Sequence, residues 1–178
     1  PEFITDSTVP STPNRLKELS CTQFVEEVKR LLSTPYSEIA YTELIESETK
    51  RAYEAVQSKA NYNFSITPEL FSQYQEIHFK AVEKLMPASI VVVRYGNLKQ
   101  QQLFVDAVVK LCMKPFINGE VGVVGTNLLH LFAAAFLLHT IGVACVKFGY
   151  FQLLNVIFKT KVSAGNVLSP SYGYNLAF

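Results

Sequence analysis

Hydrophobic positions recur at helical spacing along most of the chain and predict an all-α fold. From Ser20 onwards, Phe24, Val28 and Leu31 fall on one helical face, and Ser20 and Gln23 have the spacing of a capping box. The next proline predicts that this helix ends just before it. The first predicted element is therefore an amphipathic helix that needs an apolar partner.

Three further helices are predicted before residue 114. Residues 37–59 are rich in helix formers but have a thin apolar face, so we expect this helix to be the most exposed. Thr67 has the position of an N-cap with Pro68 at the first helical position, and the apolar stripe that follows continues to Leu85, close to Pro87. A helix over 98–113 is closed by a proline and an Asn-Gly turn.

One short run has a different pattern. Residues 89–93, Ser-Ile-Val-Val-Val, are mostly β-branched, and they predict a short extended segment. No run of similar strength elsewhere provides an obvious partner strand. Together with a last amphipathic segment that reaches Lys161, the pattern predicts a bundle of about five to six helices.

The longest apolar stretch, from Val121 to Val146, contains no charged residue and exceeds the roughly 18 residues typical of a membrane span. It also contains Asn127, His130 and His139, which are costly in hydrocarbon but find partners inside a protein. The amphipathic helices need an apolar partner, and a helix that is apolar on every side supplies one. We therefore expect residues 127–146 to form the central buried helix, with membrane insertion as the alternative.

A stripe along this helix suggests how it packs. Ala135, His139, Gly142, Val146 and Gly149 are spaced by four and three residues and share one side. The small residues among them would let another backbone come close. This side is expected to be tightly packed.

The remaining segments frame a single domain over residues 15–161. Residues 1–14 are rich in Ser, Thr and Pro and are expected to be a flexible lead-in, with a cloning scar at 1–3. Residues 162–178 are uncharged and predict an extended tail, in which Tyr172, Leu176 and Phe178 point to one side. We expect these three side chains to anchor the tail, either in a groove of its own domain or on a neighbouring molecule. In the second case the tail would produce a homo-oligomer.

Composition and charge narrow the function classes. The 178 residues are 49% hydrophobic and 17% charged, with a net charge of +1. Residues 1–84 hold 9 Lys+Arg and 13 Asp+Glu, and residues 85–178 hold 7 and 2, but the basic residues are scattered and do not favour nucleic-acid binding. The 3 cysteines have no CxxC spacing and no secretory signal is visible, which indicates the cytoplasm or nucleus, or the cytosolic face of a membrane.

No catalytic, cofactor or metal site is predicted. His130 and His139 are nine residues apart, which puts them on opposite faces of a straight helix. Cys145 lies about 120° around the same helix from His139, so the two do not form a local nucleophile pair. Each histidine is expected to be a core residue with a hydrogen-bond partner.

The favoured function is a non-enzymatic helical protein–protein interaction module, an adaptor or complex subunit that binds a partner protein through a groove or an exposed helix face. Glu43, Glu46 and Glu48, on the acidic helix, are the candidate contacts for a basic partner. One alternative is a membrane-associating protein that inserts residues 121–158 as a span or hairpin. Another is an enzyme with a site assembled from distant residues.

Overall fold

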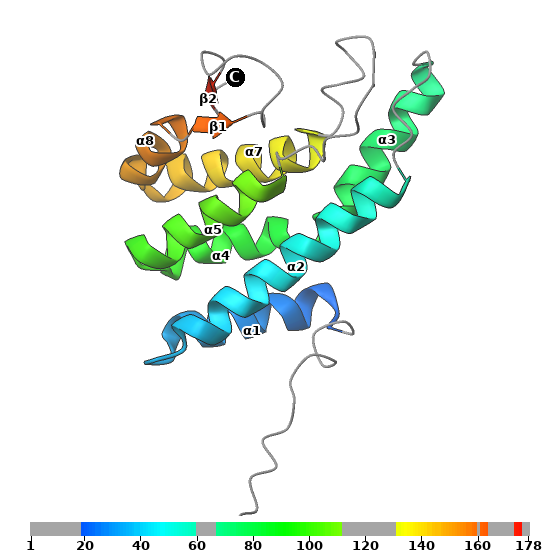
Figure 1. The fold of residues 1–178 in the computed structure, drawn as a ribbon. Helices are drawn as coiled ribbons and strands as arrows, with labels where there is room; N and C mark the ends of the chain where they lie inside the picture. Colours follow the sequence, from blue (N-terminus) through cyan, green and yellow to red (C-terminus); the bar gives the residue numbers. More distant parts are fainter. Residues whose placement is uncertain (1–18, 60–66, 112–130, 160, 164–172, 176–178) are drawn as a thin grey trace, which may run out of the picture.

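The computed structural model of the chain describes residues 19–59, 67–111, 131–159, 161–163 and 173–175. These residues form seven helices and one pair of three-residue strands (Figure 1), so the all-α class is confirmed. The elements are α1 (Cys21–Ser33), α2 (Glu38–Lys59), α3 (Pro68–Ala81), α4 (Leu85–Tyr95), α5 (Leu98–Leu111), α7 (Phe132–Phe148), α8 (Phe151–Lys159), β1 (Lys161–Ser163) and β2 (Gly173–Asn175). The strands are antiparallel, with Val162 opposite Tyr174.

The helices are stacked in tiers between two ends of the molecule (Figure 1). Helix α1 lies at one end and α7 and α8 at the other, with α4 and α5 between them. Helix α4 packs against both α1 and α7, while α5 packs against α2, α7 and α8. Helix α3 joins the tiers on one side through its contacts with α2 and α7.

The predicted helix starts at Ser20 and Thr67 are confirmed. The Ser20 hydroxyl accepts a hydrogen bond from the Gln23 N–H, and the Gln23 side chain accepts one from the Ser20 N–H. Thr67 accepts from the Leu70 N–H, and the proline that follows occupies the first turn. Helix α5 begins with a similar reciprocal pair between Asn97 and Gln100.

The segment predicted to be extended is instead part of α4, so the prediction for residues 89–93 is wrong. Ser89, Val92 and Val93 are buried between α4 and its neighbours. Pro87 lies in the first turn of α4, where its missing N–H is not needed by the helix, so it does not act as a stop. β-branched residues cost only a few tenths of a kcal/mol each in a helix, and packing against two helices outweighs that.

The expectation that residues 37–59 form the most exposed helix is also wrong. Tyr41, Ile45, Ala52 and Val56 recur on one face of α2 and are buried, because this helix packs against α1, α3 and α5. The Tyr41 hydroxyl donates a hydrogen bond to the Gln100 carbonyl 3.2 Å away. Apolar side chains spaced by four or seven residues are enough to pack a helix against its neighbours, even where its apolar stripe is thin.

Helix α7 ends at a left-handed glycine that turns the chain back. Gly149 has φ +76°, a conformation that L side chains rarely adopt, and the Tyr150 N–H donates to the Cys145 carbonyl at 2.9 Å. Helix α8 begins at the next residue and packs against α7. The role of Gly149 is therefore to end the helix and not to pack in a stripe.

The other end of α7 is held by a buried histidine from α3. His78 is completely buried, and its Nδ1 accepts a hydrogen bond from the Ala133 N–H at 3.2 Å. Ala133 is in the first turn of α7, where backbone N–H groups have no partner within the helix. His78 also lies edge-on to Phe132, with ring centroids 5.9 Å apart. The expectation of a hydrogen-bonded core histidine is confirmed for this residue.

Several predicted features lie outside the described residues: the lead-in over 1–14, the start of the uncharged helix at Asn127 and His130, and the tail residues Tyr172, Leu176 and Phe178. Within the described part of the chain, none of the helices has both the length and the apolar character that crossing a bilayer requires.

Replacing His78 with phenylalanine should lower the free energy of unfolding by about 1–3 kcal/mol, because the Ala133 N–H loses its acceptor and the larger phenyl ring must fit a fully buried site. Urea unfolding of the purified chain measures this change. His139→Phe is the matched control, since His139 lies exposed on α7, the helix that His78 caps, and its effect should stay within about 0.5 kcal/mol. The expectation of a core histidine is therefore wrong for His139. Equal stability of wild type and His78→Phe would contradict the capping role.

Candidate functional site

Helix α7 is apolar on all sides, but the described helices bury mainly one of them. Its inner face, with Leu137 and Ile141 at the centre, is buried against the neighbouring helices. On the outer face Val143 is 55% exposed and Val146 is 62% exposed. The predicted stripe therefore faces outward, and the expectation that this side of the helix is tightly packed is wrong.

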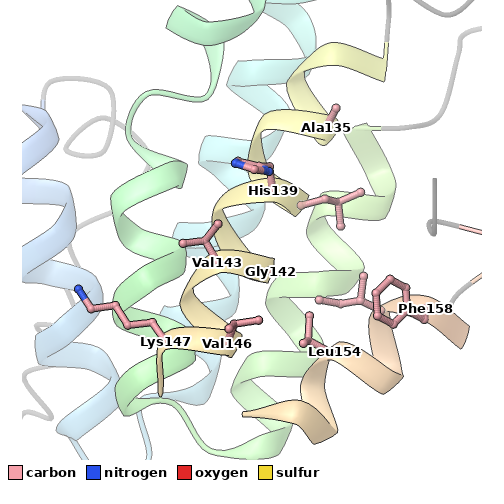
Figure 2. Close-up of a pocket in the computed structure, with 10 residues that line it drawn as sticks. Ala135, His139, Gly142, Val143, Val146, Lys147, Leu154 and Phe158 are labelled. Atoms are coloured by element: carbon pink, nitrogen blue, oxygen red, sulfur yellow. The ribbon is translucent and has the colours of Figure 1, made fainter. Parts of the chain in front are cut away.

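Helix α8 turns the open face of α7 into a groove. It has 9 residues against 17 in α7, so it is too short to cover the outer face and forms a wall beside it (Figure 2). The groove has a volume of about 680 Å³, within the range of ligand sites in proteins. Its lining residues are Ala135, Leu138, His139, Gly142, Val143, Val146, Lys147, Leu154, Ile157 and Phe158.

The two walls have the regular spacing of helix faces. The lining residues that α8 contributes are Leu154, Ile157 and Phe158, which are spaced at i, i+3 and i+4. Phe158 is 54% exposed and stands at the rim (Figure 2), whereas Ile157 is buried. An elongated apolar hollow between two helices results, rather than a scatter of exposed side chains.

Gly142 is the one glycine among the lining residues. A Cβ atom added to it would meet no other heavy atom within 4 Å. A glycine in a helix interior is destabilising relative to alanine, and here no neighbouring backbone or side chain of the described structure explains its presence. What it does is leave the backbone of α7 open to an atom that enters the groove.

The groove has little capacity for chemistry of its own. Of its ten lining residues only His139 and Lys147 have titratable side chains, and neither has a described carboxylate as an ion-pair partner. Cys145 is on the buried side of α7, and burial raises the pKa of its thiol to about 11, so it is protonated at neutral pH. Over the described ranges, no three His, Cys, Asp or Glu residues are grouped closely enough to hold a metal ion.

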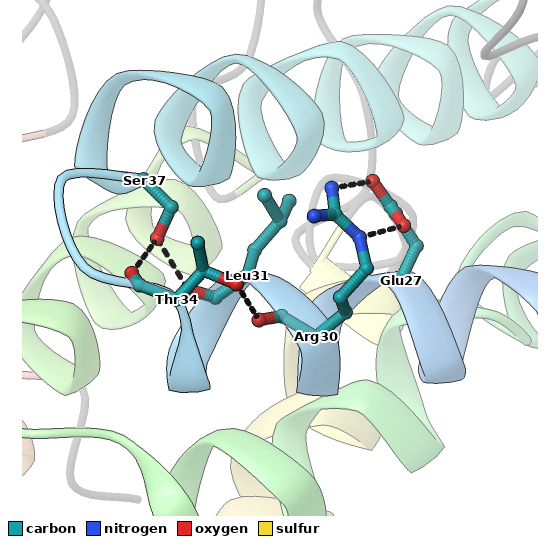
Figure 3. A network of polar contacts seen from close by, with 5 residues as sticks. All are labelled: Glu27, Arg30, Leu31, Thr34 and Ser37. Atoms are coloured by element: carbon teal, nitrogen blue, oxygen red, sulfur yellow. Dashed lines mark hydrogen bonds and ion pairs between the residues drawn. The ribbon is translucent and has the colours of Figure 1, made fainter.

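A second, polar hollow of about 310 Å³ lies at the turn between α1 and α2. Its polar groups are used to close helix ends (Figure 3). Ser37 Oγ is within hydrogen-bonding distance of the Leu31 and Thr34 carbonyls, and Thr34 Oγ1 donates to the Arg30 carbonyl at 2.8 Å. The Asn97 and Gln100 side chains at its edge form the cap of α5. We assign this hollow a structural role.

The three acidic candidates on α2 are in different environments. Glu43 is exposed and forms no ion pair with a described residue. The Glu46 carboxylate pairs with Lys110 of α5 at 2.5 Å. Glu48 is 4% exposed and pairs with Arg51, whose guanidinium also donates to the Ala81 carbonyl at 3.1 Å. The structure therefore does not bring these three carboxylates together on one free surface.

The sequence shows the α7 stripe of the groove but predicts the wrong role for it. The spacing of Ala135, His139, Gly142 and Val146 predicts a packing contact, and the structure leaves this side open. The matching stripe of α8 was visible too, as an amphipathic segment, but no sequence signal shows that the Gly149 turn places it beside α7. Comparison of the chain with protein-family models, curated proteins and solved structures finds no match.

Gly142→Ala should raise the free energy of unfolding by about 0.5–1 kcal/mol, because alanine is the better helix former and its Cβ meets no neighbour. Gly96→Ala is the opposite control, since its Cβ would stand 2.6 Å from the Val92 carbonyl oxygen and should destabilise the chain. Thermal and urea unfolding measure both changes in stability, the gain expected for Gly142→Ala and the loss expected for Gly96→Ala. A loss of stability in Gly142→Ala would show that the groove floor is packed in solution.

Proposed function

We propose that this chain is a non-enzymatic protein-interaction module whose α7–α8 groove receives an apolar helix of a partner protein. The observation that supports this most directly is the outer face of α7, which no described helix covers and where Val143 and Val146 are more than half exposed beside an open backbone at Gly142. Contiguous apolar hollows of this kind are typical of interaction sites in proteins.

The shape of the groove favours a helical ligand. Along α7 its lining residues extend from Ala135 to Lys147, which is about 18 Å at 1.5 Å per residue, or just over three helical turns. Two helix faces that form a trough match the ridge of a third helix, in which apolar side chains recur at i, i+3 or i+4 and i+7. The open backbone at Gly142 gives such a ridge a point of close approach.

The energetic gain from such binding comes from the exposed side chains of the groove. Covering a fully exposed Val, Leu or Phe side chain contributes about 1.5–3 kcal/mol. Val143, Val146 and Phe158 are each about half exposed, so a large part of that contribution remains to be gained. These three residues surround the floor and are the expected anchors of the site.

Membrane association is the second candidate, and one observation favours it. Phe151 and Val146 are exposed on the same end of the molecule that carries Lys147 and Lys159, a combination that also suits an anionic lipid surface. We favour a protein ligand because the apolar region is hollow. A flat bilayer would leave the groove floor at Gly142 unfilled, whereas a helical ridge fills it.

A photo-crosslinking residue at Val146 should capture one partner protein in cells, and the same residue at Glu26 on α1 should not, because Glu26 is exposed at the far end of the molecule. Gly142→Leu should then weaken binding of the purified partner at least about tenfold, since the leucine side chain fills the groove from within. Isothermal titration calorimetry measures the two affinities, and urea unfolding checks that Gly142→Leu remains folded.

Two results would contradict the proposal. Equal capture from Val146 and Glu26 would show that the groove is not the contact surface. Unchanged affinity of Gly142→Leu for the purified partner would show that the floor of the groove is not occupied. Sedimentation with lipid vesicles, lost on Val146→Asp, would support the membrane alternative instead.

A further inference from the structure

We infer that the ligand of the α7–α8 groove is an amphipathic helix with an acidic side chain beside its apolar ridge, placed to meet Lys147. This inference rests on the proposed function and specifies the chemistry of its partner. It starts from the distribution of charge over the described helices.

Acidic groups are absent from the part of the molecule that forms the groove. Residues 132–159 contain two lysines, Lys147 and Lys159, and no aspartate or glutamate. The six ion pairs found among the described residues all use carboxylates of α1, α2 or α3. Lys147 takes part in none of them.

The same molecule shows how its lysines behave where two helices meet. On α5, Lys99 pairs with Glu38 and Lys110 pairs with Glu46, and both glutamates belong to the facing helix α2. Lys147 has the corresponding position on the open face of α7: it lines the groove and no described helix faces it with a carboxylate. Its Nζ lies over the Phe148 ring, 5.9 Å from the ring centroid.

A ligand helix would change the surroundings of Lys147. In Figure 2 this side chain projects from the flank of α7 that is turned away from α8, so it forms the rim opposite Phe158. A helix seated between these rims would remove water from the Lys147 ammonium group. An apolar neighbour would leave that charge desolvated and unpaired, a basic one would repel it, and an acidic one would pair with it. Charge therefore selects among helices that fit the groove equally well.

The test uses three synthetic, helix-stapled peptides that share one leucine ridge at i, i+4 and i+7 and differ only in the flanking residue, which is Glu, Gln or Lys. Fluorescence anisotropy with the full chain gives their affinities at low and moderate salt. The Glu peptide should bind about threefold to tenfold tighter than the Gln peptide, and the Lys peptide should bind most weakly. Salt should reduce the difference between them.

Two variants assign the effect to one residue. Lys147→Glu should reverse the order, so that the Lys peptide binds best. Lys29→Glu makes the same charge change on an exposed residue of α1, at the other end of the molecule, and should preserve the wild-type order. A reversal by both variants would mean that net charge alone steers binding, and would overturn the inference.

The remaining outcomes distinguish failure of the acidic-partner inference from failure of the proposed binding function. Peptides that bind equally whatever their flank, but lose binding on Gly142→Leu, would overturn the acidic partner and leave the groove as a binding site. No binding by any peptide would overturn both. Binding of the chain to vesicles with 30% phosphatidylserine, lost on Lys147→Glu while no peptide binds, would assign the cationic rim to a membrane surface.

Discussion

Helix α7 has more apolar surface than the helices around it can cover, and this mismatch determines the character of the molecule. Its inner face is buried by α3, α4 and α5. Its outer face depends on α8, which follows directly in the chain and is about half as long. A short helix packed against a long apolar one leaves part of the long helix in contact with water, and that remainder is the groove.

An open apolar face requires that the helix be held firmly by other means. At the N-terminal end His78 supplies an acceptor for a backbone N–H that α7 cannot satisfy itself. At the C-terminal end Gly149 allows the left-handed turn in which the Tyr150 N–H closes the helix. Both ends of α7 are thus held by contacts that do not involve its outer face, and its inner face is buried.

The parts of this fold that the sequence predicted are the ones that local physical chemistry decides. The hydroxyls of Ser20 and Thr67 and the ring of Pro68 act within one helical turn, so their positions define helix starts without any knowledge of the rest. Residues 89–93 were misassigned because their β-branched side chains favour a strand locally, whereas burial between α1 and α7 decides for a helix. The sequence shows the apolar stripes of α7 and α8 separately. It does not show that they form a groove, because the angle between the two helices depends on the turn and on tertiary packing.

The fold also accounts for part of the charge asymmetry along the chain. The sequence predicts a surface for a basic partner on the acidic helix of the first half, whereas the basic residues of the second half are scattered. In the fold, Glu46 of α2 faces Lys110 of α5, and Glu48 turns inward to Arg51, so part of the acidic helix stabilises contacts within the molecule. Lys147 has no such counterpart: it takes part in none of the six ion pairs found among the described residues. At the groove, a lysine without a described ion-pair partner therefore lies beside an incompletely covered apolar surface, and we propose that a single amphipathic helix with an acidic side chain satisfies both.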